Sequence, residues 1–151
     1  MTAAIIVVIV LVLDQLTKFM VQNSAVLQTQ SIPIIPGFFY LTYVKNTGAA
    51  WSAFADKTQL LALVSAVAVG VMLWYVITRK PKKWILFALA LMIGGAAGNM
   101  IDRIWLGYVR DFFDFYPFGY NFPVFNVADI ALTIGVIMLI LASLKEEDQH
   151  A

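Results

Sequence analysis

Four apolar segments, each close to the length of a membrane-spanning helix, limit what this chain can fold into more than any other feature. They cover residues 3–21, 60–78, 84–104 and 127–144. A helix rises about 1.5 Å per residue, so about 20 residues cross the roughly 30 Å hydrocarbon core of a bilayer. Hydrophobic residues make up 62% of the chain, which is above the proportion typical of soluble domains. The sequence therefore predicts an all-α polytopic membrane protein with four transmembrane helices, in a single domain covering residues 1–151.

The loops between these segments indicate how the helices cross the membrane. Basic residues crowd the short turn at positions 79–83, which reads Arg-Lys-Pro-Lys-Lys. Cytoplasmic loops carry an excess of Lys and Arg. We therefore expect this turn and both chain ends inside, and the longer connections 22–59 and 105–126 outside. Asp14 interrupts the first apolar segment and no basic residue precedes that segment, so we expect it to be retained rather than cleaved as a signal peptide.

The first outer connection is predicted to contain short strands. Residues 38–44 are rich in aromatic and β-branched types, follow prolines at positions 33 and 36, and precede a Thr-Gly turn. We expect a small extracytoplasmic β-rich segment that rests on the outer leaflet. The second outer connection carries many aromatic residues between positions 112 and 125. We expect these to act as an interfacial anchor rather than as a specificity pocket, or to form a lid over a cleft.

Charged side chains inside the apolar segments indicate a functional site. A charge in the middle of a bilayer costs about 3 kcal/mol or more, and usually marks function. Three sets of polar residues share a helix face because they are spaced by three or four positions: Asp14 with Lys18; Asn99 with Asp102 and Arg103; and Asn126 with Asp129. All lie toward the outer ends of their predicted spans. The orientation therefore gathers them near one plane, close to Asp111 of the second outer connection.

The residue types available limit the chemistry of such a site. The chain has no Cys, and its one His, His150, lies in the polar tail. A thiol nucleophile, a Ser-His protease and a His-Glu-x-x-His zinc site are therefore excluded. Two carboxyl groups remain as acid and base, because like charges about 3 Å apart cannot both ionise and so share a proton. We expect no metal and no cofactor, and a net charge of +1 gives no support to nucleic-acid binding.

Three classes of function stay open on residue types alone: an intramembrane aspartyl peptidase, a proton-coupled transporter, and a non-enzymatic membrane assembly factor. Buried Asp and Lys also mark ion pathways, although here the inner halves of the spans are apolar and the chain shows no internal repeat. Asp14 with Lys18 can be a scaffold ion pair. Asp129 can be a carboxylate stabilised by a helix dipole. By spacing, Asp114 is an alternative partner of Asp111.

Five ordered blocks of the sequence resemble the lipoprotein signal peptidases, also called type II signal peptidases. They are LDQLTK (13–18), KNTGAAWS (45–52), GGAAGNMIDR (94–103), GYVRDFFDF (107–115) and FNVAD (125–129). The resemblance implies a multi-pass enzyme of the bacterial cytoplasmic (inner) membrane, with its active site near the extracytoplasmic face. Such enzymes cut the signal peptide from prolipoproteins just before a diacylglyceryl-modified cysteine. They use two aspartates and no metal, and by motif the pair corresponds to Asp111 and Asp129.

The same resemblance implies a set of residues that support the site or bind the substrate. By motif these are Asp14, Lys18, Asn46, Gly48, Gly98, Asn99, Asp102, Arg103 and Asn126. The partners it implies are lipidated prolipoproteins and membrane lipid. We expect the enzyme to be a monomer.

Overall fold

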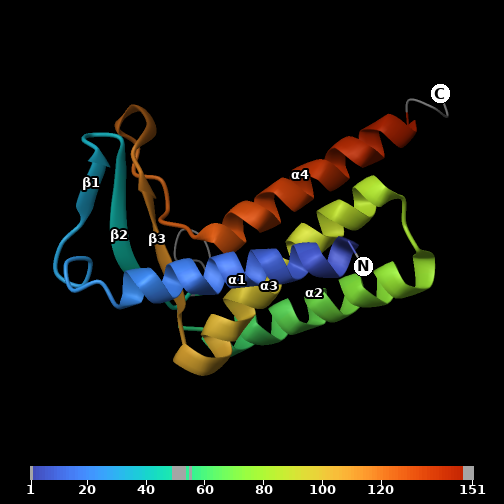
Figure 1. Ribbon diagram of the computed structural model, residues 1–151, viewed down its shortest axis with the longest axis horizontal. Coiled ribbons are helices and arrows are strands. Elements are labelled where there is room, and N and C mark those ends of the chain that lie inside the picture. The colour runs from blue at the N-terminus through green and yellow to red at the C-terminus, as the bar shows by residue number, and fades with distance from the viewer. Residues whose placement is uncertain (1, 49–53, 55, 148–151) are drawn as a thin grey trace.

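The computed structural model describes residues 2–48, 54 and 56–147, and consists of four long helices with a three-stranded sheet at one end (Figure 1). The helices are α1 (Thr2–Gln22), α2 (Thr58–Arg79), α3 (Lys83–Leu106) and α4 (Val127–Glu147). All four are long and apolar enough to cross a membrane. The four apolar segments predicted from the sequence therefore do form helices, with ends that differ by a few residues.

Helix α3 is the centre of the bundle and packs against α1, α2 and α4. Small residues permit this close approach. A Cβ atom added at Gly94 would lie 2.8 Å from the Val10 side chain of α1, and one added at Gly95 would collide with the Ala128 carbonyl of α4. Small residues at a helix interface commonly allow such contact between helices in a membrane. By contrast, α2 leaves most of its surface exposed.

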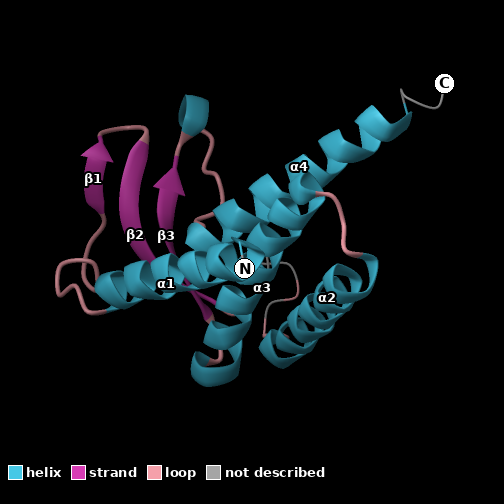
Figure 2. Cartoon of the chain, turned by 45° about the vertical axis from the view of Figure 1, so that its right-hand side comes forward, coloured by secondary structure: helices cyan, strands magenta, loops and turns pink. Residues whose placement is uncertain are grey.

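The sheet is antiparallel with the strand order β1-β2-β3 (Figure 2). Its strands are β1 (Ile32–Ile35), β2 (Phe39–Asn46) and β3 (Val109–Phe115). The first two confirm the strands expected in the first outer connection. The third was not predicted, since that stretch was expected to be only an interfacial anchor or a lid. The aromatic run hides the strand because β3 is covered on both faces, and Phe112 is buried against Val21 and Leu27.

The backbone around β3 brings the start of α4 close to the end of α3. Helix α3 ends at Leu106, and the φ of 77° at the following Gly107 lets the chain reverse into the strand. On the strand's other edge, the backbone N–H groups of Phe112 and Phe113 both donate to the Phe125 carbonyl. Because α4 begins two residues after Phe125, this pairing fixes the start of α4 beside β3.

The two ends of the bundle differ in character. The sheet, the end of α3 and the start of α4 lie at one end in Figure 1, while the α2–α3 turn, the start of α1 and the end of α4 lie toward the other. The basic turn at 79–83 is thus separated by the length of the helices from the plane of polar residues.

Candidate active site

Asp111 lies on β3 with its carboxyl group held by two amides. Asn46 of β2 donates from Nδ2 to Oδ2 of Asp111 at 2.8 Å, and Asn126 donates from Nδ2 to Oδ1 at 2.6 Å. The side chain is almost completely buried. Burial, together with the neighbouring charge of Asp129, raises the pKa of Asp111 to about 7. Near neutral pH this carboxyl group can therefore both hold and release a proton.

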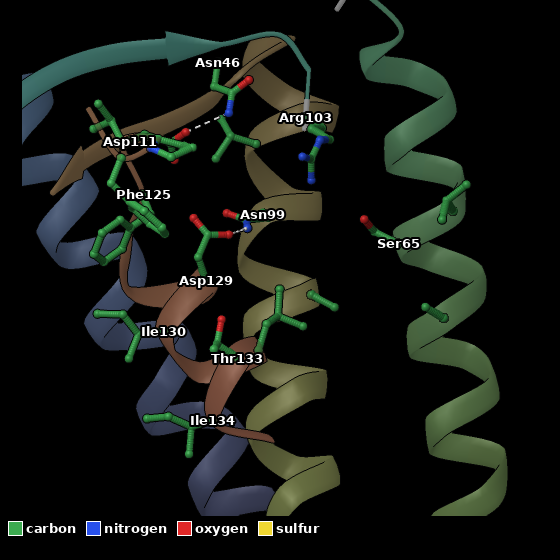
Figure 3. Close-up of a pocket in the computed structure, with 18 residues that line it drawn as sticks. Asn46, Ser65, Asn99, Arg103, Asp111, Phe125, Asp129, Ile130, Thr133 and Ile134 are labelled. Carbon is green, nitrogen blue, oxygen red and sulfur yellow. Dashed lines mark hydrogen bonds between the residues drawn. The ribbon is translucent and has the colours of Figure 1, made fainter. Parts of the chain in front are cut away.

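Asp129 lies in the first turn of α4 and faces the same space as Asp111 (Figure 3). Its Oδ1 accepts a hydrogen bond from Asn99 Nδ2 at 2.7 Å, and its Oδ2 accepts one from the backbone N–H of Asn126 at 3.1 Å. Asn126 in turn accepts from the backbone N–H of Asp129 at 3.0 Å. This reciprocal pair is a capping box. Asn126 therefore caps α4, and the same residue also contacts Asp111.

Two asparagines connect the aspartates across the site. Asn126 Nδ2 donates to Asn99 Oδ1 at 3.1 Å, and Lys18 Nζ donates to the same oxygen at 2.9 Å. A lysine ammonium can only donate hydrogen bonds. Asn99 must therefore turn its oxygen toward Lys18, which leaves its amide N–H groups for Asp129. In this way Lys18 determines the orientation of a donor to Asp129 without touching that residue.

A neutral cluster of four charges lies next to the aspartates, between α1, α3 and β3. Lys18 is 2.9 Å from Asp14 and 3.4 Å from Asp102, and Arg110 Nη2 is 2.6 Å from the other oxygen of Asp102. All four side chains are buried. Buried charges of this kind persist only when they are paired and hydrogen-bonded, since an unpaired one costs several kcal/mol. Asp14 and Lys18 thus form the scaffold ion pair anticipated from their spacing.

Asp102 and Arg103 are adjacent on α3 but contact different parts of the site. Asp102 is bonded to Lys18 and Arg110, whereas Arg103 lines the cavity and donates from Nη2 to the Gly48 carbonyl at 3.2 Å. Adjacent positions on an α-helix point about 100° apart. The two side chains therefore reach different neighbours, although each shares a helix face with Asn99.

Gly48 links two of the predicted residues. Its backbone N–H donates to Asn46 Oδ1 at 2.9 Å, and its carbonyl accepts from Arg103. The first bond fixes the amide of Asn46 so that its N–H groups face Asp111. The rest of the KNTGAAWS block, positions 49–52, lies outside the described residues.

Asp114 takes no part in the pair. Its Oδ2 accepts a hydrogen bond from Thr42 Oγ1 at 2.6 Å, and it does not line the cavity that Asp111 and Asp129 share. The alternative of an Asp111–Asp114 pair is therefore not supported. The reason is the strand itself, because Asp114 lies three positions after Asp111 and so faces the other side of the sheet.

Sequence reasoning missed two polar residues of this region, Gln15 and Arg110. Gln15 Nε2 donates to Asp14, Asp102 and the Gly98 carbonyl at 3.1–3.2 Å. It also accepts from Arg110 Nη2 at 2.8 Å. The signal that could have found Arg110 is a single cation inside an aromatic run, since such a residue needs a buried partner.

The two aspartates lie at one end of a cavity of about 750 Å³ between α2, α3, α4 and the strands (Figure 3). Polar groups are confined to a few positions, and Ser65 reaches the cavity from α2. The remaining wall is mostly apolar and is contributed by Val64, Ala68, Ala96, Val109, Phe122, Pro123, Val124, Phe125, Ile130, Leu132 and Ile134. An apolar cavity with a few convergent polar groups is the usual form of a ligand site.

The groups around the aspartates suit proton transfer rather than metal binding. Asn46, Asn99 and Asn126 all present N–H donors to the carboxyl oxygens, and a cation would require acceptors there. Within the described part of the chain, no three Asp, Glu, His or Cys residues lie close enough to hold a metal ion.

Comparison with known proteins gives consistent matches over the whole fold. The sequence matches the signal peptidase II family over residues 6–145. It is 44% identical to a lipoprotein signal peptidase of Symbiobacterium thermophilum over 93% of each chain. It is 40% identical to one of Clostridium acetobutylicum over 96% of this chain and 95% of the relative. A solved structure described as a bacterial membrane enzyme superposes with a TM-score of 0.92 at 35% identity, over 99% of this chain and 92% of that one.

Proposed function

The chain belongs to the signal peptidase II family of aspartic peptidases, which remove signal peptides from prolipoproteins, and on that premise we propose that Asp111 and Asp129 are its catalytic pair. The observation that carries the proposal is their placement. Both carboxyl groups line the same cavity. Each of their four oxygens accepts a hydrogen bond from one N–H group.

The pair shares one proton near neutral pH, and Asp111 is the member that holds it. Burial and the charge of Asp129 raise the pKa of Asp111 to about 7. Asp129 accepts hydrogen bonds from Asn99 and from the backbone N–H of Asn126 at the positive end of α4, and we assign it the role of base. Two neighbouring carboxyl groups resist ionising together, so the acid and base roles divide between them.

The reaction then proceeds in two proton-balanced steps. Asp129 takes a proton from a water molecule while the water oxygen bonds to the scissile carbonyl carbon, and Asp111 gives its proton to the carbonyl oxygen. A gem-diol results. Next, Asp129 passes its new proton to the leaving amine nitrogen as the C–N bond breaks, and Asp111 recovers a proton from a gem-diol hydroxyl. The pair ends with the single proton it began with.

The substrate is a lipidated prolipoprotein, cut just before its diacylglyceryl-modified cysteine. The mostly apolar wall of the cavity is suited to a substrate held in the membrane. Asn46, Arg103 and Gly48 form the polar rim next to Asp111. Arg103 Nε is buried and has no hydrogen-bond partner within the described residues, which leaves it available to a substrate carbonyl.

The enzyme lies in the bacterial cytoplasmic membrane with both ends inside and the catalytic pair near the outer face. Support comes from the separation of the basic turn at 79–83 from the aspartates by the length of the helices. The second support is the cluster of exposed aromatic residues beside the sheet, Phe118, Tyr120 and Phe122, since aromatic side chains favour the membrane interface. We propose that the enzyme acts as a monomer.

Cleavage of a purified lipidated precursor in a bilayer, with the cut located by mass spectrometry, tests this function. Asp111→Asn and Asp129→Asn each lower kcat by about 10²- to 10⁴-fold, because an amide cannot exchange the proton. Asp114→Asn is the matched control, since it alters a carboxylate of the same strand outside the cavity. Wild-type turnover by purified Asp129→Asn enzyme contradicts the assignment.

A further inference from the structure

Arg110 precedes Asp111 on β3, and its side chain donates four hydrogen bonds. Its Nε donates to Asp102 Oδ2 at 3.1 Å and its Nη2 donates to Asp102 Oδ1 at 2.6 Å. The remaining donors reach Gln22 at 2.9 Å and Gln15 at 2.8 Å, both on α1. The backbone N–H of Arg110 also donates to Asp102, at 3.0 Å. One residue thus ties β3 to α1 and α3 at once.

The strand needs such an anchor at this position because its backbone pairing is irregular there. Asp111 pairs with Val44 of β2, but Phe113 pairs with Leu41, so two residues of β2 stand opposite the single residue Phe112. An extra residue of this kind is a β-bulge, and it locally disrupts the ladder. The ladder alone therefore gives weak control over which way Asp111 points.

Side-chain alternation makes the anchor directional. Successive residues of a strand point to opposite faces, so a side chain fixed at Arg110 on the side of α1 and α3 obliges Asp111 to face the cavity. A slip by one residue reverses both. It would turn Asp111 toward Asp102 and Asp14, which are carboxylates, and would turn a buried arginine into the cavity. Repulsion between carboxylates thus disfavours the shifted register, and the ion pair of Arg110 with Asp102 favours the observed one.

We propose that Arg110 is a positioning residue: by binding Asp102, Gln15 and Gln22 it holds β3 in the register that presents Asp111 to Asp129. The inference rests on the proposed catalytic role of Asp111. Arg110 itself touches neither the cavity nor the carboxyl groups of the pair.

The experiment compares kcat and KM of full-length variants on a lipidated precursor in a bilayer. Arg110→Met lowers kcat by about 100-fold, the loss expected for a catalytic group displaced by roughly 1 Å. KM changes less than about threefold because the cavity wall is intact. Arg110→Lys keeps the charge, but an ammonium group cannot make the two parallel hydrogen bonds to Asp102 and also reach Gln15 and Gln22. Its kcat therefore falls by about tenfold. Lys45→Met is the control, since it removes a cation from the residue paired with Arg110 on β2, where the side chain is exposed.

A double variant separates positioning from charge balance. Arg110→Met leaves Asp102 with fewer partners and can lower the melting temperature. Arg110→Met combined with Asp102→Asn restores a neutral cluster, because Asp14 and Lys18 still pair. Positioning predicts that the melting temperature recovers while kcat stays about 100-fold low. Recovery of kcat together with stability overturns the proposal, as does wild-type kcat in Arg110→Met or Arg110→Lys.

Asp111→Asn enzyme in the same assay keeps the two hypotheses apart. If Asp111→Asn turns over normally, the proposed catalytic pair is wrong. If Asp111→Asn is inactive and Arg110→Met is fully active, the pair stands and only the positioning role fails.

Discussion

Asn126 and Asp129 cap the start of α4 reciprocally: the backbone N–H of each donates to the side chain of the other, at 3.1 Å and 3.0 Å. The amide nitrogen of Asn126 is left free by this arrangement. It donates to Asp111 at 2.6 Å and to Asn99 at 3.1 Å. One asparagine therefore stabilises a helix end and orients the proposed catalytic pair.

The two roles of Asn126 can be separated by a pair of substitutions. Asn126→Ser retains a good capping oxygen but has no amide to donate, so kcat falls by about 10- to 100-fold while stability is nearly unchanged. Asn126→Ala loses the cap as well and is less stable by about 1 kcal/mol. Thermal unfolding and turnover of the two purified variants give the comparison. Equal kcat in Asn126→Ser and wild type would show that Asn126 is only a cap.

The helices and the polar plane could be predicted from the sequence because both depend on local spacing. A span of about 20 apolar residues needs no knowledge of its neighbours. Asp14 and Lys18 share a face at four positions, and they do form an ion pair. The spacing of residues along the sequence could not predict which side chains on different helices and strands would bind each other. Asp102 binds Arg110, which lies beyond a helix end and a turn.

The strand β3 shows the other limit. A strand with one buried face alternates apolar and polar residues, but β3 is covered on both faces and reads as an aromatic run. Its run Phe112-Phe113 resembles an interfacial anchor as much as a strand. Hence the sequence located Asp111 near the site without revealing the element that carries it, and Arg110 was not recognised.

Gly98 is expected to tolerate no side chain. A Cβ atom there would lie 2.5 Å from Asp14 Oδ2, and Asp14 cannot yield because it is bonded to Lys18 and to the backbone N–H of Ala128. Gly98→Ala therefore lowers stability by about 1–3 kcal/mol. Gly70→Ala of α2 is the matched control, since nothing lies within 4 Å of its added Cβ. A Gly98→Ala protein that melts like Gly70→Ala contradicts the packing described for α1 and α3.

The pKa of Asp111 predicts how activity depends on pH. Burial and the charge of Asp129 raise this pKa to about 7, and the proposed mechanism needs Asp111 protonated. The value of kcat/KM should therefore fall as the pH rises through 7. A pH profile measured on a lipidated precursor tests this. A plateau that extends to pH 9 would show that Asp111 is not the acid.

The same pKa predicts a stability effect with a definite sign. The folded protein keeps a proton on Asp111 up to about pH 7, whereas an unfolded Asp loses its proton near pH 4. Between these pH values only the unfolded state ionises. The free energy of unfolding therefore falls as the pH rises from about 4 to about 7. Asp111→Asn removes that loss. The melting temperature of Asp111→Asn relative to wild type should therefore be higher at pH 8 than at pH 5. A pH-independent difference would mean that Asp111 ionises normally.

Membrane orientation can be tested with introduced cysteines because the chain has none of its own. Cysteines at Lys45 of β2 and at Tyr120, which follows β3, should react with an impermeant thiol reagent added to intact cells. A cysteine at Lys82, in the basic turn, should react only after the membrane is opened. Labelling at position 82 in intact cells would reverse the proposed orientation and put the catalytic pair at the inner face.

Lipidation of the substrate is expected to raise the rate of cleavage by fixing the depth of the scissile bond in the bilayer. Each methylene moved out of water contributes about 0.8 kcal/mol, but acyl chains already in a bilayer gain little on entering an apolar cavity. The lipid should therefore hold the scissile bond at the level of Asp111 and Asp129 rather than strengthen binding. An unlipidated precursor that keeps its signal helix should be cleaved at least about 100-fold more slowly, the loss expected for roughly 1 Å of misplacement.

Measuring kcat and KM for both precursors in the same bilayer distinguishes an effect of the lipid on the depth of the scissile bond from an effect on binding affinity. If depth is the cause, kcat falls for the unlipidated precursor while KM changes little, because the signal helix still concentrates it in the membrane. A rise in KM at constant kcat would instead assign the lipid to binding. Equal kcat/KM for the two precursors would show that this enzyme does not recognise the lipid, and the apolar wall formed by residues such as Leu132 and Ile134 would then serve the signal helix alone.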